Sequence, residues 1–297
     1  MPLSRFLRLL ALCLLLPGLL VLAPGCRRSA VAPGDPVAAV KGLAAALRDN
    51  DLVRYSQLSM PPALHKQMEE RWHQKLLAAA PPTAAQKKDY AQWMERLTGP
   101  DAEAKLYARF DARMKRFEPE IRSQWPLMQA TGGIFLNGLI KANDKLGPDE
   151  KAHAQAIAQA LLAWLKPEMI VDRERARRSI SVLTESARDL DLPTLDDTRK
   201  LEMLPALEKG GEVLRTFKDV AKIYGLDADA SLASVQAKVV EASGDSATME
   251  VSYPLMGKTV HFEMELLRRE KRWYPADAVR KAEAELARPV PPNGAKS

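Results

Sequence analysis

The chain contains very little cysteine: its 297 residues include only Cys13 and Cys26. Cys13 lies inside an apolar run near the N-terminus, so it is lost if that run is removed as a targeting segment. Cys26 then has no partner in the same chain. This scarcity excludes an internal disulfide and a metal site built from several thiolates.

The chain also lacks the short motifs of common enzyme classes. It has no G-x-S-x-G, no serine followed three residues later by lysine, no G-x-x-x-x-G-K phosphate loop, no G-x-G-x-x-G, no H-E-x-x-H and no calcium-loop pattern. We therefore expect a protein that is not an enzyme and that carries no cofactor.

Charge of one sign is not concentrated anywhere in the chain. Lys and Arg number 44 against 38 Asp and Glu, which gives a net charge of +6. Removing Arg5 and Arg8 with the N-terminal segment leaves 42 basic and 38 acidic residues, a net charge of +4. Because nucleic-acid-binding proteins gather their basic residues on one face or segment, we expect no nucleic-acid partner.

The N-terminal apolar run is too short to span a membrane. It covers residues 9–23, follows Arg5 and Arg8, and is broken by Pro17 and Gly18. A membrane-spanning helix needs about 20 apolar residues. The pattern of a positive segment followed by a short apolar run predicts a cleaved export signal over residues 1–25.

The residues that end this run carry a resemblance. The segment "LAPGC", residues 22–26, is similar to the lipobox of bacterial lipoproteins, although Ala23 and Pro24 depart from its usual residues. The resemblance implies that Cys26 carries lipid, becomes the mature N-terminus and anchors the chain to a membrane. Arg27 in place of aspartate implies the inner leaflet of the outer membrane, facing the periplasm. The alternative is an ordinary signal peptide, cleaved after Ala30 or Ala32.

The remainder of the chain reads as an α+β domain over residues 35–288. A tether over residues 26–34 precedes it, and a disordered tail over residues 289–297 follows it. Helical patterns run from about residue 35 to residue 230, and Asp35 with Pro36 forms a helix start. We expect "KGG" at 209–211 to break a helix, and "TGGIFLNGLI" at 131–140 to form a buried one. Trp72, Trp93, Trp125 and Trp164 fall on apolar stripes, which favours core positions.

The last third of the chain changes period. Apolar residues alternate with polar ones in three segments over residues 234–275, and turn residues lie at each join. This predicts a C-terminal antiparallel β-meander of three to four strands with its apolar face packed on helices. A final helix is expected at about 276–287. The fold class is therefore α+β, mainly α-helical.

The two ends of this domain show a further resemblance. "ALRDNDL" at 46–52, and a terminal sheet ending in "REKRWYPAD" at 269–277, are similar to lipoproteins with a nuclear-transport-factor-like or cystatin-like domain. The resemblance covers about residues 35–60 and 232–280. It implies a curved sheet that wraps a long helix and leaves a pocket.

Two Glu-x-x-His pairs are the candidate metal ligands. Glu70 with His73, and Glu150 with His153, each place a carboxylate and an imidazole on one helix face. Two-metal carboxylate proteins hold their ions between such pairs on facing helices. The alternative explanation is a solvated helix face, and Glu150 also suits a helix N-terminus without any metal.

These patterns together predict a lipid-anchored periplasmic binding or structural protein of the bacterial envelope. Its expected partners are the membrane, through lipid on Cys26, and either an envelope protein or an apolar ligand held between helices and sheet. The alternative function is a metal-dependent enzyme that uses the two Glu-x-x-His pairs.

Overall fold

The computed structural model describes residues 30–144 and 146–289. The predicted signal segment, Cys26 and residues 290–297 lie outside them. The helices are α2 (Pro36–Arg48), α3 (Leu52–Ser59), α4 (Pro62–Ala78), α5 (Ala84–Thr98), α6 (Ala102–Ser123), α7 (Trp125–Ala142), α8 (Pro148–Trp164), α9 (Pro167–Ile170), α10 (Arg173–Asp189), α11 (Leu195–Arg199), α12 (Met203–Ile223), α13 (Ala228–Ala233) and α14 (Ala276–Ala287). The strands are β1 (Gln236–Ser243), β2 (Ser246–Leu255), β3 (Lys258–Arg269) and β4 (Arg272–Pro275).

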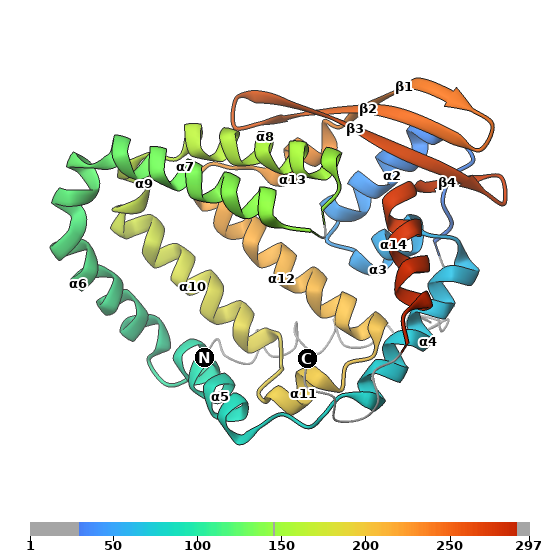
Figure 1. The fold of residues 1–297 in the computed structure, drawn as a ribbon. Coiled ribbons are helices and arrows are strands. Elements are labelled where there is room, and N and C mark those ends of the chain that lie inside the picture. The colour runs from blue at the N-terminus through green and yellow to red at the C-terminus, as the bar shows by residue number, and fades with distance from the viewer. Residues whose placement is uncertain (1–29, 145, 290–297) are drawn as a thin grey trace, which may run out of the picture.

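The strands form one antiparallel sheet in the order β1-β2-β3-β4. This confirms the predicted α+β class, mainly helical with a C-terminal meander (Figure 1). The β2–β3 hairpin closes through Met256 and Gly257, both at positive φ, as a two-residue turn of this kind requires. The register pairs Met249 with Met264 and Val251 with Phe262, so the alternating apolar residues of both strands share one face.

Helix α2 packs against that apolar face. Asp35 accepts a hydrogen bond from the Ala38 N–H at 2.7 Å, which caps the helix as predicted. Ala39, Val40 and Ala44 then join the sheet core, whose other buried members are Val235, Ala247, Met249, Val251, Leu266 and Trp273. A second buried cluster ties α2 to α3, β4 and α14. These two clusters hold the N-terminal and C-terminal parts of the chain together.

Residues 30–34, which we expected to belong to the tether, pack on the domain instead. Ala32 is only 1% exposed. The Ala30 N–H donates to the Gln57 side-chain oxygen at 2.9 Å, and Arg272 donates to the Ala32 carbonyl at 2.8 Å. Residues 30–34 therefore belong to the folded domain and not to the tether.

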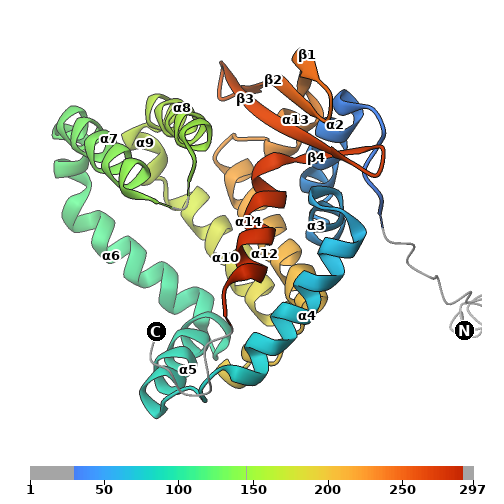
Figure 2. The ribbon, with the colours of Figure 1, turned by 45° about the vertical axis from the view of Figure 1, so that its right-hand side comes forward.

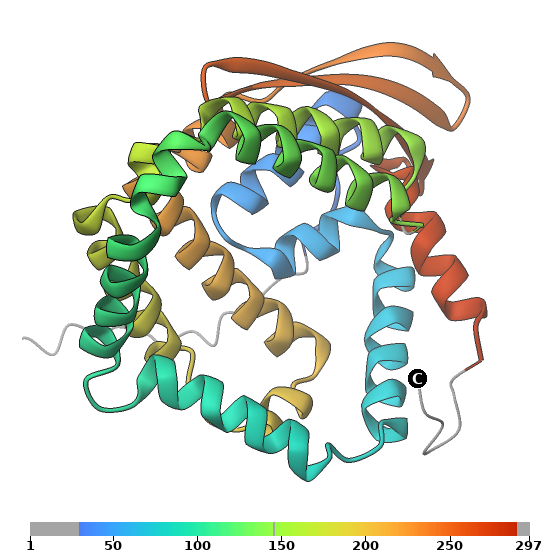
Figure 3. The same cartoon turned by 60° about the vertical axis from the view of Figure 1, so that its left-hand side comes forward.

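The middle of the chain forms a ring of helices beneath the sheet. Helices α4, α5, α6 and the α7–α8 pair follow one another around it, and α10 and α12 cross it (Figure 3). Helix α10 packs on α5, α6 and α12. Helix α14 descends from β4 beside α4 (Figure 2). There, Arg71 of α4 donates to the carbonyls of Glu285 at 2.8 Å and Leu286 at 3.2 Å, at the end of α14.

Two expectations about glycine-containing segments are wrong. Helix α12 runs through "KGG" without a break. Gly211 lies where the helix crosses the loop before α3, and its missing side chain lets the two backbones approach closely. A Cβ at Gly211 would overlap the Asn50 carbonyl oxygen. The segment 131–140 is helical within α7, but no residue of α7 is buried. Ile134 and Phe135 are 74% and 65% exposed.

No helix among residues 30–144 and 146–289 is long and apolar enough to cross a membrane. Helix α7 is the most apolar of the long helices, yet its exposed side chains include several large apolar ones. It packs mainly on α8 and, less extensively, on α6. Two of the four tryptophans expected in the core are also exposed, Trp72 at 40% and Trp93 at 53%.

Candidate functional site

A cavity of about 850 Å³ lies between the apolar face of the sheet and the helices. Pockets for small molecules in proteins measure about 300–1,000 Å³, so its size suits one. Its walls come from α2, α3, the first turns of α8, α12, α13, β2, β3 and α14. These elements are far apart in sequence, and the packing of α2 on the sheet brings them together.

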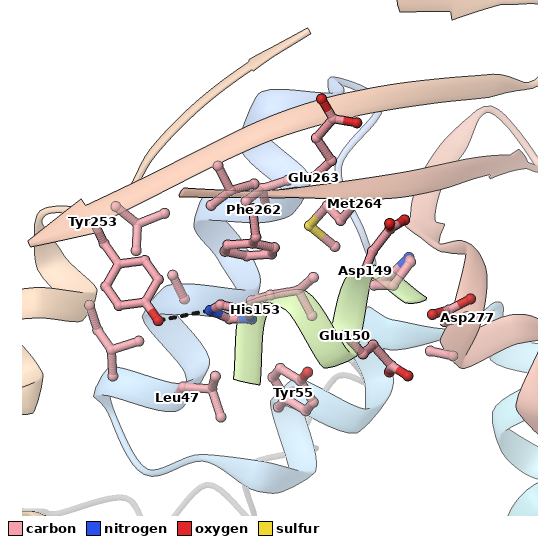
Figure 4. A pocket seen from close by; sticks show the side chains of 18 of the residues that line it. Leu47, Tyr55, Asp149, Glu150, His153, Tyr253, Phe262, Glu263, Met264 and Asp277 are labelled. Atoms are coloured by element: carbon pink, nitrogen blue, oxygen red, sulfur yellow. Dashed lines mark hydrogen bonds between the residues drawn. The ribbon is translucent and has the colours of Figure 1, made fainter. Parts of the chain in front are cut away.

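Apolar side chains make most of the walls. They lie on the inward face of β2 and β3 and on the facing sides of the helices (Figure 4). The large apolar members are Val40, Leu43, Leu47, Leu214, Leu232, Val235, Val251, Leu255, Phe262 and Met264. The period-two pattern of the strands therefore builds one wall, and the helical stripe of α2 builds the other.

A hydrogen-bonded pair interrupts this apolar lining. His153 Nε2 lies 2.8 Å from the Tyr253 hydroxyl, and the His153 ring stacks on Phe262 with centroids 3.9 Å apart (Figure 4). Burial lowers the pKa of His153 below its ordinary value and raises the pKa of Tyr253 to about 12. Both groups are thus neutral at pH 7, and each satisfies the other inside an apolar wall.

Lys218 of α12 lines the same cavity, yet its ammonium group is fully engaged. The residue is 9% exposed. Its Nζ donates to the Leu47 carbonyl at 2.6 Å, to the Arg48 carbonyl at 3.0 Å and to Asp229 at 2.6 Å. An ammonium has three hydrogens to donate, so Lys218 closes the C-terminal end of α2 and has no donor left for a ligand.

The mouth of the cavity carries charge. Glu150 accepts two contacts from Lys281 Nζ, at 2.6 and 2.8 Å, and one from the Gly147 N–H at 2.9 Å. Partial burial opposes its ionisation, but these hydrogen bonds and the charge of Lys281 prevail and hold the pKa of Glu150 below its ordinary value. Asp149 and Asp277 lie at the same end of the cavity (Figure 4).

The structure does not bring the two Glu-x-x-His pairs together. His73 is exposed on α4 and lies 2.7 Å from Glu202, the residue that precedes α12, and Glu70 is exposed as well. Glu150 is bonded to Lys281 and His153 to Tyr253, on α8. Helix α4 packs on α3, α12 and α14, whereas α8 packs on α7 and β3.

The four candidate ligands therefore do not meet at one site. No group of three or more His, Cys, Asp or Glu side chains among the residues that the structure describes could hold a metal ion. The pair at Glu150 and His153 instead contributes to the cavity. Sequence reasoning missed Tyr253 and Lys218, although Tyr253 lies on the same alternating stripe as Val251, which marked it as an inward-facing position.

The chain matches no protein-family model, and neither a curated protein nor a solved structure is significantly similar to it.

Proposed function

We propose that this protein binds a small, mainly apolar molecule in the cavity behind its sheet, while lipid on Cys26 holds it at the periplasmic face of the outer membrane. The observation that carries the binding proposal is the cavity of about 850 Å³ with apolar walls. Protein interiors ordinarily contain few voids larger than a water molecule. A space of this size, lying between packed elements and partly open to solvent, suits a ligand.

The composition of the walls supports a ligand over bulk water as the occupant. Dry cavities in proteins are apolar, and ordered water needs two to four polar partners. The polar groups deep in this cavity already bond to one another or to the backbone: His153 to Tyr253, and Lys218 to two carbonyls and Asp229. An apolar molecule would cover these walls without breaking these hydrogen bonds.

The anchoring proposal is supported by the "LAPGC" segment, and the packing of Ala30 on the domain says what an anchor there would do. Ala30 is already hydrogen-bonded to Gln57. Only three residues lie between Cys26 and Ala30, and an extended chain reaches at most about 3.6 Å per residue. An acylated Cys26 would therefore hold the domain close against the membrane surface.

A cavity-filling variant tests the binding proposal. Ala278 of α14 lines the cavity, and Ala284 is exposed on the same helix. We expect the purified chain to bind a neutral naphthylamine dye with increased fluorescence, Ala278→Trp to abolish binding, and Ala284→Trp to preserve it. Circular dichroism confirms that each variant is folded. Failure of the wild-type chain to bind, or equal binding by both variants, would refute the proposal.

The anchor is tested separately by mass spectrometry of the mature N-terminus. We expect a diacylglyceryl group on residue 26, and release of the Cys26→Ser variant from the membrane fraction. A mature chain that begins after Ala30 or Ala32 would refute the anchor and would leave the binding proposal standing.

A further inference from the structure

The charges at the cavity mouth are unequal in sign. The first turns of α8 and α14 place Asp149, Glu150 and Asp277 at one end of the cavity, away from Tyr253 (Figure 4). The cationic residues lining this end are Arg280 and Lys281. Glu263 and Glu265 of β3 also line the cavity, and Lys218 lies farther inside. The lining as a whole therefore carries five carboxylates and three cations.

Both cations already have carboxylate partners. Lys281 is bonded to Glu150 at 2.6 Å. Arg280 pairs with Glu265 of β3 at 2.8 Å, and its distance to Asp277 is longer, at 4.0 Å. Asp149 forms no ion pair within 4.0 Å in the part of the chain that the structure describes. Among the residues that the structure describes, this end of the cavity therefore presents negative charge to a ligand, and Asp149 and Asp277 are exposed there.

The features that would attract an anion are already occupied. The positive end of the α8 dipole is met by its own Glu150, which accepts from the Gly147 N–H. Lys218, farther inside, has all three hydrogens bonded to protein acceptors. A carboxylate or phosphate headgroup would find neither the Gly147 N–H nor the Lys218 ammonium free to donate a hydrogen bond, and it would be repelled by the negative charge at the mouth.

Resting on the proposed function, we propose that the cavity selects cationic amphiphiles: its ligand is an apolar molecule that carries a protonated amine. The apolar part lies against Phe262 and the wall of α2. The ammonium lies at the mouth, where Asp149 and Asp277 pair with it while it remains near water. The acids thus set the sign of the ligand's charge, and the apolar walls provide the affinity.

The test compares three probes with the same twelve-carbon chain. The full chain is loaded with the neutral naphthylamine dye at pH 7 and titrated with dodecylamine, dodecanol or dodecanoate, below their micelle-forming concentrations. We expect dodecylamine to displace the dye at about tenfold lower concentration than dodecanoate, with dodecanol between them. The tenfold difference, about 1.4 kcal/mol, combines the attraction of the acids for the amine with their repulsion of the carboxylate. Raising the salt concentration reduces the difference.

Charge-neutralising variants locate the source of the preference. The Asp149→Asn and Asp277→Asn double variant keeps the shape of the mouth, and we expect it to bind the dye normally but to lose the preference for the amine. Glu283→Gln, at an exposed position of α14, is the matched control and retains the preference. Equal displacement by amine and carboxylate, tighter binding of the carboxylate, or an amine preference that survives in the double variant would overturn this inference while dye binding still supports the cavity. Absence of dye binding would overturn the proposed function itself.

Discussion

Replacing Lys218 with methionine tests the buried ammonium that joins α12 to the end of α2. The side chain is 9% exposed and bonds to the Leu47 carbonyl, the Arg48 carbonyl and Asp229. Methionine keeps the apolar stem but leaves the two carbonyls without this donor. Hydrogen bonds from charged groups contribute about 1.5–3 kcal/mol each. The Leu47 carbonyl keeps the hydrogen bond that it accepts from the Asn50 N–H at 3.2 Å, so it is not left unpaired. Asp229 is half exposed and regains water, so we expect a loss of about 3 kcal/mol in the free energy of unfolding.

The assay is urea unfolding monitored by circular dichroism. The unfolding free energies of the variant and the wild-type chain are compared where both curves have the same dependence on urea concentration. The matched control is Lys222→Met, one turn later on the same helix, where the side chain is 68% exposed and pairs with Asp227 at 3.3 Å. Exposed pairs of this kind contribute little, so we expect no measurable change. Equal unfolding free energies for the two variants would refute the account of Lys218 as a buried link between helices.

Three further predictions concern a close approach, a titration and an exposed face. Gly211→Ala destabilises the fold, because its Cβ would overlap the Asn50 carbonyl, whereas Gly138→Ala in open space on α7 raises the thermal midpoint. Burial lowers the pKa of His153, so the unfolded chain takes up the proton first and the stability of the fold falls as pH drops below about 6.5. We expect the urea midpoints at pH 7.5 and pH 5 to differ less in His153→Gln than in the wild-type chain. An equal difference in the two chains would contradict this. Ile134→Glu with Phe135→Glu on α7 leaves the thermal midpoint nearly unchanged, because both side chains are mostly exposed; a large drop would show that the face is covered.

The sequence was sufficient for the features that depend on local pattern. The alternation in β2 and β3 predicted which residues face the core, and Ala247, Met249 and Val251 are buried as expected. The Asp35 cap and the final helix were also predictable. The pattern was less reliable in β1, where Val239 is 41% exposed. There the strand lies at the edge of the sheet, and its register shifts between Val239 and Glu241.

Features that depend on contacts between distant segments were not predictable. Gly211 looked like a helix breaker because its packing against the Asn50 carbonyl cannot be seen in the sequence. The apolar composition of α7 suggested burial, but its packing on α8 and α6 leaves no residue of the helix buried. His153 was paired with Glu150 by spacing alone, whereas the sheet offers it Tyr253 and Phe262. Tertiary packing, absent from any local pattern, decides each of these cases.

Native mass spectrometry of the full chain mixed with dodecylamine tests the central claim most directly. If the cavity binds an apolar amine, the wild-type chain carries one ligand per molecule, Ala278→Trp carries none, and Ala284→Trp carries one. A wild-type chain without bound amine, or the same adduct in Ala278→Trp, would contradict the account.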